Sequence, residues 1–149
     1  MSERYFEDFR VGDRYRSADY NVTEAEIVEY ARRYDPQSFH TDPVAAKRSL
    51  FGGLVASGWY TAAITMRLIA QSEPRVAGGL IGLGVEQLRW PQPVRPGDVL
   101  HVEVEVLDLR PSRSHPDHGI VRVRNITRTQ TGETVQTMET ALWVLRRGQ

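Results

Sequence analysis

Hydrophobic positions recur with a helical period in the first half of the chain. One apolar stripe is formed by Ile27, Tyr30, Ala31 and Tyr34. The segment Val22–Ile27 is typical of a helix start, because Thr23 can cap, Glu26 stands at the capping-box position and the two apolar ends are spaced as a hydrophobic staple. Pro36 lacks an N–H and disfavours helical backbone in the preceding residue, so this helix is predicted to end near Asp35.

Two further helices follow. A short one is expected to begin at Asp42-Pro43, with the aspartate as N-cap and the proline in the first helical position. The stretch from about Val55 to Ala70 has almost no charge before Arg67. Its apolar side chains are at helical spacing, at Trp59, Ala62, Ala63, Met66 and Ile69 or Ala70. This pattern indicates a helix that is buried on most sides.

From Gly79 onward the period changes to two, as expected for strands. Valine and leucine alternate with polar residues over residues 100–106, and residues 121–130 and 134–145 read as two long strands with a tight hairpin at Gly132. A less regular strand is expected from Gly79 to Trp90, where Gly82 and Gly84 suggest a close backbone approach to the apolar helix. The prediction is therefore an α+β fold in which an antiparallel sheet wraps around a long central helix.

The composition of the chain excludes several classes of function. The 149 residues suit one domain, and 19 basic residues balance 19 acidic ones, without the basic excess that nucleic-acid binding needs. The chain has no cysteine, which excludes disulfides, thiol catalysis and a thiolate zinc site. The longest uncharged run, Ser49–Met66, contains glycine and hydroxyl residues and reads as a buried helix, not a membrane span. Six charged residues are spread over the first thirteen positions and leave no room for an apolar stretch, so we expect no signal peptide and a cytoplasmic location.

Asp35 and His40 are the leading candidates for chemistry. On a continuous helix, residues five apart would point about 140° away from each other. Pro36 removes that constraint, so a loop between two helices can aim a carboxylate and an imidazole at one centre for proton transfer. The spacing alone leaves open a structural alternative, in which Asp35 caps a turn and His40 fills a gap.

The segment Asp35-Pro36-Gln37-Ser38-Phe39-His40 resembles the signature Asp-x-Asn-Pro-x-His of the MaoC-like dehydratases, a hot-dog-fold family that includes the (R)-specific enoyl-CoA hydratases. Gln37 stands in place of the usual Asn and Ser38 in place of the usual Pro. The resemblance continues through the segments 51–58 and 93–100, which look like the entry into the family's central helix and a lead into one of its strands. It implies a single MaoC-like hot-dog domain over residues 1–149.

The resemblance also implies an activity, the reversible hydration of 2-enoyl-CoA to (R)-3-hydroxyacyl-CoA. By position, Asp35 and His40 would be the catalytic pair, and the backbone N–H of Gly58 would stabilise the oxyanion, with Gln37 and Ser57 as further substrate-binding residues. The coenzyme A thioester would be the substrate, and neither a cofactor nor a metal is implied. Proteins of this type usually pair through an exposed sheet edge, so we expect a homodimer or a higher homo-oligomer.

Two rival functions stay open at this point: an acyl-CoA thioesterase on the same fold, and a non-catalytic acyl-CoA-binding module. Other candidate sites are weaker. The loop with His115, Asp117 and His118 reads as a solvated turn and not a metal site. Thr65, like Thr61, could reach toward Asp35, but a helical threonine bonded to its own backbone is the simpler reading.

Overall fold

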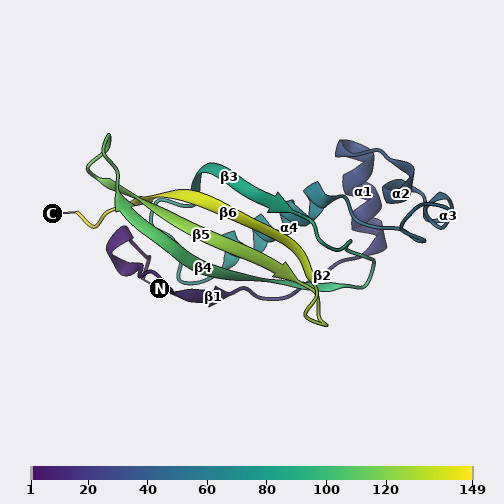
Figure 1. Ribbon diagram of the computed structural model, residues 1–149, viewed down its shortest axis with the longest axis horizontal. Helices are drawn as coiled ribbons and strands as arrows, with labels where there is room; N and C mark the ends of the chain where they lie inside the picture. Colours follow the sequence, from purple (N-terminus) through teal and green to yellow (C-terminus); the bar gives the residue numbers. More distant parts are fainter. Residues whose placement is uncertain (1, 149) are drawn as a thin grey trace.

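The computed structural model describes residues 2–148, in which short helices precede a sheet. The elements are η1 (Phe6–Asp8), β1 (Arg14–Arg16), β2 (Tyr20–Asn21), α1 (Glu24–Tyr34), α2 (Ser38–Thr41), α3 (Pro43–Ala46), α4 (Gly58–Gln71), β3 (Ile81–Arg89), β4 (Val99–Pro111), β5 (His118–Arg128) and β6 (Thr134–Leu145). The antiparallel strands are ordered β1-β4-β5-β6-β3, and β2 pairs with the start of β4. Figure 1 shows α4 lying across one face of the sheet, with α1, α2 and α3 gathered at one end. The predicted α+β class is confirmed.

The β5–β6 hairpin forms where the sequence predicted it. Gly132 adopts a φ of +85°, a left-handed backbone conformation that glycine takes without steric cost. The pairing that follows is long and antiparallel, from Arg128 opposite Thr134 to His118 opposite Leu145. The alternation along β4 holds only in part: Leu100 and Val102 are fully buried on the inner face, but His101 between them, expected on a solvent-exposed face, is only 7% exposed.

Helix α4 is half-exposed, so the prediction of a helix buried on most sides was wrong. Its buried face consists of Thr61, Ile64, Thr65 and Leu68. Trp59 on the opposite side is 57% exposed and Met66 is 43% exposed. The helix therefore carries few charges even though one of its faces, which includes Trp59 and Met66, is exposed in a single copy of the chain. The helix also begins at Gly58, three residues later than expected, because Val55 and Ala56 precede it in buried, non-helical backbone.

Strand β3 is an uncovered edge. The expected close approach at Gly82 and Gly84 was wrong, because a Cβ at either position would meet no atom within 4 Å. The pairing of β3 with β6 instead shifts register between these two glycines, which marks a β-bulge. Ile81, Leu83 and Val85 are all exposed, and β6 is the only strand that pairs with β3 among the residues described.

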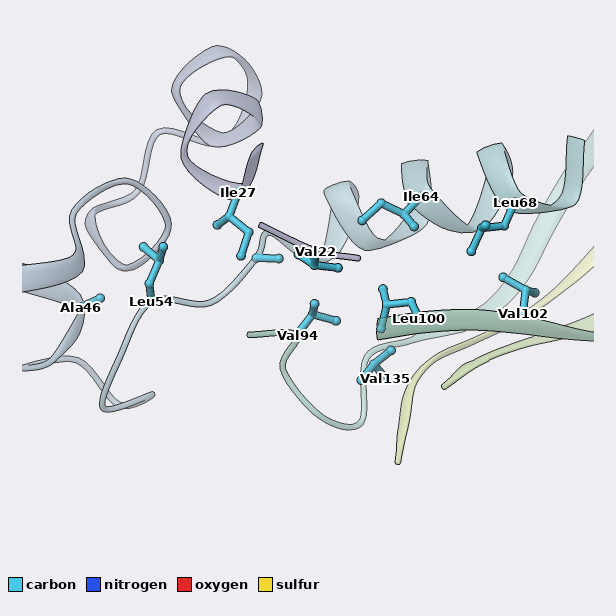
Figure 2. Packing of buried hydrophobic residues seen from close by; sticks show 11 residues of the cluster. Val22, Ile27, Ala46, Leu54, Ile64, Leu68, Val94, Leu100, Val102 and Val135 are labelled. Atoms are coloured by element: carbon cyan, nitrogen blue, oxygen red, sulfur yellow. The ribbon is translucent and has the colours of Figure 1, made fainter. Parts of the chain in front are cut away.

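The core joins α4 to the sheet and to α1. Figure 2 shows Ile64 and Leu68 of α4 facing Leu100 and Val102 of β4, with Ile27 of α1 in the same cluster. A second apolar cluster lies nearer the chain termini, around Phe9, Val106, Val121, Val123 and Val144. The first cluster matters for function, because it packs α1 against α4 and α4 against the sheet.

Over residues 2–148, none of the helices combines the length and the apolar character that crossing a bilayer requires.

Candidate active site

Asp35 sits at the point where α1 ends. Its N–H still donates to the Ala31 carbonyl at 2.8 Å, but its own backbone has left the helix, with φ −153° and ψ 68°. Pro36 explains the break, since it disfavours helical backbone in the residue before it. The Gln37 N–H then donates to the Asp35 carbonyl at 2.7 Å, which closes a tight turn toward α2. The predicted helix end is confirmed.

His40 lies on α2 and is buried. Its Nδ1 is 2.6 Å from the carbonyl oxygen of Val55, in the segment that leads into α4. Because a carbonyl oxygen can only accept, Nδ1 carries a hydrogen and the tautomer is fixed. Nε2 therefore faces Asp35, 3.3 Å from Oδ2. The predicted meeting of the two side chains is present in the structure.

A second contact, on the other oxygen Oδ1, also orients the Asp35 carboxylate. The Gln37 side-chain amide donates to Oδ1 at 2.5 Å. Burial raises the pKa of Asp35, but the hydrogen bond from Gln37, the Ser57 hydroxyl and the charge of His40 together hold this pKa below its ordinary value. With Nδ1–H bonded to Val55, the contact between Nε2 and Oδ2 is attractive when one proton lies between them. The pair can thus hold a proton and pass it on.

The N-terminus of α4 provides a second polar feature. Ser57 is fully buried and caps the helix, accepting a hydrogen bond from the Trp59 N–H at 3.2 Å. Gly58 is the first helical residue, so its N–H has no acceptor within the helix and lies at the positive end of the helix dipole. Such an N–H can stabilise an anionic oxygen.

Trp90 packs directly on Gly58, a contact that the sequence did not reveal. A Cβ on Gly58 would lie 2.5 Å from the Trp90 ring, too close for two carbon atoms. The ring is held in place because its Nε1–H donates to Gln136 at 2.9 Å. Glycine is therefore required here by packing, whatever else its N–H does.

The structure brings four of the predicted site residues together, since Asp35 contacts His40 and Gln37 and its pKa is lowered by Ser57. Gly58 follows Ser57 in sequence. Thr65 does not take part, because its hydroxyl donates to the Thr61 carbonyl at 2.9 Å and contacts Thr127 at 2.7 Å. The hydrogen bond of His40 to Val55 could not be predicted, because a backbone acceptor leaves no mark in the sequence.

The histidine loop at the other end of the sheet is a separate structure. His118 contacts Asp117 at 3.0 Å, and the rings of His115 and His118 both pack against Trp143. Across the described part of the chain, residues 2–148, no group of three or more histidine, aspartate or glutamate side chains is arranged to hold a metal ion.

Two surface cavities lie away from the Asp35–His40 pair. An open groove of about 760 Å³ runs between α1 and α3 over Val28 and Arg32, and a cavity of about 540 Å³ lies at the β4–β5 turn. Neither is lined by Asp35 or His40, whose side chains are 18% and 7% exposed. In one copy of the chain, solvent reaches the pair, but the pair lies in neither of these two cavities.

Comparisons with known proteins identify the family of the chain. Residues 8–129 match the family model described as MaoC like domain. The crystal structure of the MaoC-like dehydratase from Rhodospirillum rubrum is 51% identical, with a TM-score of 0.93 over 98% of this chain and 99% of that one. The (R)-hydratase from A. caviae involved in PHA biosynthesis is 29% identical, with a TM-score of 0.74 over 90% of this chain and 96% of that one.

A third relative is the 3-hydroxybutyryl-CoA dehydratase of Methylorubrum extorquens, 31% identical over 110 residues, which are 73% of this chain and 68% of that protein. The shared architecture with the (R)-hydratase confirms the predicted hot-dog fold. By its family model, by its fold and by these relatives, the chain belongs to the MaoC-like dehydratase family.

Proposed function

We propose that this protein hydrates 2-enoyl-CoA thioesters to (R)-3-hydroxyacyl-CoA, and catalyses the reverse dehydration, by acid–base chemistry without a cofactor. The observation that carries the proposal is the contact between Asp35 Oδ2 and His40 Nε2 at 3.3 Å, in a tautomer fixed by Val55. Two relatives described as a hydratase and a dehydratase support the reaction class.

Hydration requires that one proton be removed from water and that one proton be delivered to C2 of the substrate. In the hydration direction, a water bound beside the pair loses a proton to one member as its oxygen forms a bond to C3. The C2–C3 π bond breaks, and C2 takes a proton from the other member. The proton gained by the base then crosses the Oδ2–Nε2 contact, which restores the starting state. Each proton transfer of this kind typically contributes about 10² to 10⁴ in rate.

Negative charge develops on the thioester oxygen when water adds to C3. The N–H of Gly58 at the start of α4 is our candidate donor to that oxygen, with the helix dipole adding to the field. Ser57 and Gln37 lie beside the carboxylate, and we propose that they align it while contacting the substrate.

Crotonyl-CoA tests the proposal, because hydration and hydrolysis give different signals. We expect loss of the conjugated enoyl absorbance without release of free thiol, and an (R)-3-hydroxybutyryl-CoA product. Release of thiol would instead identify a thioesterase, and binding with neither signal would identify an acyl-CoA-binding module; either result contradicts the proposed hydratase.

We further propose that the working form is a homodimer joined along β3. The edge strand exposes Ile81, Leu83 and Val85, and α4 exposes Trp59 and Met66. Edge strands expose unpaired backbone groups that a second copy can satisfy. A second copy on this edge would also cover apolar side chains near α4, which would help to enclose the substrate.

Leu83→Glu is expected to convert the dimer to a monomer at micromolar concentration, because a carboxylate at the centre of an apolar edge would lose its water on pairing. Light scattering coupled to size-exclusion chromatography measures the mass. Val11→Glu is the matched control, since Val11 is also exposed but lies in a turn outside the sheet edge. A wild-type protein that elutes with the mass of one chain would contradict the proposed dimer.

A further inference from the structure

Glu26 does not use its side chain as the sequence pattern predicted. The Thr23 hydroxyl accepts from the Glu26 N–H at 3.2 Å, as in a capping box. The carboxylate, however, accepts hydrogen bonds from two tyrosine hydroxyls, those of Tyr20 on β2 and of Tyr60 at 2.7 Å. Only half of the capping box is formed, and the other half is replaced by a contact between elements.

This contact joins α1 to the first turn of α4. Tyr60 is the third residue of α4, two residues after Gly58. Its ring stacks on Tyr30 of α1, with centroids 4.9 Å apart and planes at 29°. Tyr30 in turn packs against Tyr34, the last residue of α1, at 5.1 Å. Glu26, Tyr30 and Tyr34 are spaced four apart, so one face of α1 leads from this carboxylate to the residue before Asp35.

The hydrogen bonds are charge-assisted over the ordinary pH range. The Tyr20 and Tyr60 hydroxyls lower the pKa of Glu26, against an opposing effect of burial. Burial and the hydrogen bond to Glu26 raise the pKa of Tyr60 well above its ordinary value. The carboxylate therefore stays ionised and the phenol stays protonated, and hydrogen bonds of this kind are shorter and stronger than neutral ones.

We propose that Glu26 and Tyr60 are positioning residues: their hydrogen bond fixes the first turn of α4 against α1, and so sets the place of Ser57 and Gly58 relative to Asp35. This inference rests on the proposed function for its catalytic consequence. Its structural part concerns only the geometry around the Asp35 carboxyl group and can be tested without turnover.

The groups around Asp35 make the test specific. Gln37 and His40 face its carboxylate from the start of α2, and Ser57 acts on it from the N-cap position of α4. Tyr30 is the facing group on α1; burial raises the pKa of Tyr30, and the charge of Asp35 raises it further. Of these groups, Ser57 is tied to α4 as its N-cap and lowers the pKa of Asp35. If α4 moves, that contribution is lost and the pKa of Asp35 rises.

The experiment compares Tyr60→Phe with Tyr20→Phe. Both variants remove a hydroxyl that donates to the same oxygen of Glu26, and both keep an aromatic ring, but only Tyr60 belongs to α4. Two readouts are needed: kinetic constants for crotonyl-CoA as a function of pH, and an NMR titration of the ¹³C-labelled Asp35 carboxyl carbon, assigned with Asp35→Asn.

For Tyr60→Phe we expect kcat to fall about ten- to hundred-fold, as small misplacements of catalytic groups do, with KM changed less than about three-fold. The Asp35 titration should move to higher pH, and the acidic limb of the kcat profile should move with it. Tyr20→Phe should leave both readouts close to wild type.

Equal effects of the two variants, or an Asp35 titration unchanged in Tyr60→Phe, would overturn the proposed positioning. If the wild-type protein does not hydrate crotonyl-CoA, the hydratase proposal fails by itself, and the NMR titration still decides whether Tyr60 controls the environment of Asp35.

Discussion

Asp35→Asn is expected to lower the rate of enoyl-CoA hydration by about 10³-fold or more while leaving the fold intact. An amide cannot take up the proton that Asp35 exchanges with water or with His40. The substitution preserves size, and the amide oxygen can still accept from Gln37, so the loop should keep its shape. Initial rates with crotonyl-CoA measure the loss of activity, and circular dichroism and thermal unfolding show whether the fold is intact.

Asp19→Asn serves as the control, because Asp19 is an exposed carboxylate whose only close partner among the described residues is Arg16 at 3.8 Å. It should retain the wild-type rate. His40→Ala should also abolish hydration, although it leaves the Val55 carbonyl without its donor and should cost about 1–3 kcal/mol of stability. An Asp35→Asn protein that keeps most of the wild-type rate would remove this carboxylate from the mechanism.

Gly58→Ala is expected to lower the free energy of unfolding by about 1–3 kcal/mol, the usual cost of overpacking, and to reduce activity as well. The new Cβ would lie 2.5 Å from the Trp90 ring, and moving that ring breaks its hydrogen bond to Gln136, which is fully buried. The start of α4 would shift, and the proposed oxyanion donor with it. Urea unfolding measures the loss of stability.

Gly148→Ala is a matched control, since a Cβ there meets no atom within 4 Å and Gly148 lies outside the β3 edge. A double-mutant cycle with Trp90→Ala tests the cause directly. If the clash with Trp90 is responsible, the double variant is more stable than the sum of the two single losses predicts. Strict additivity would show that the loss of stability in Gly58→Ala has another origin.

The sequence was informative wherever local chemistry decides the backbone. Pro36 ends α1 at Tyr34, Asp42 accepts from the N–H groups of Val44 and Ala45 to start α3, and Gly132 turns the last hairpin. Each of these features depends on residues within four positions of each other. Asp35 and His40 are five positions apart around a proline; this spacing allowed them to meet, and the resemblance to the family favoured their meeting over the structural alternative.

Contacts between distant segments could not be predicted in this way. The two tyrosines on Glu26 are 6 and 34 residues away, and Trp90 lies 46 residues from Gln136. A glutamate three residues after a threonine reads as a capping box, because the pattern does not say which donor the carboxylate will find. The exposure of α4 was missed for a related reason: an apolar helix face predicts a covering surface but not whether the same chain supplies it.

In the proposed mechanism, Asp35 and His40 face the double bond of a bound enoyl thioester. The most direct measurement is a crystal structure of the Asp35→Asn protein with crotonyl-CoA. We expect C3 to lie against the gap between residue 35 and Nε2 of His40, with the thioester oxygen near the N–H of Gly58. A thioester bound instead in the groove between α1 and α3, with its double bond away from His40, would contradict it.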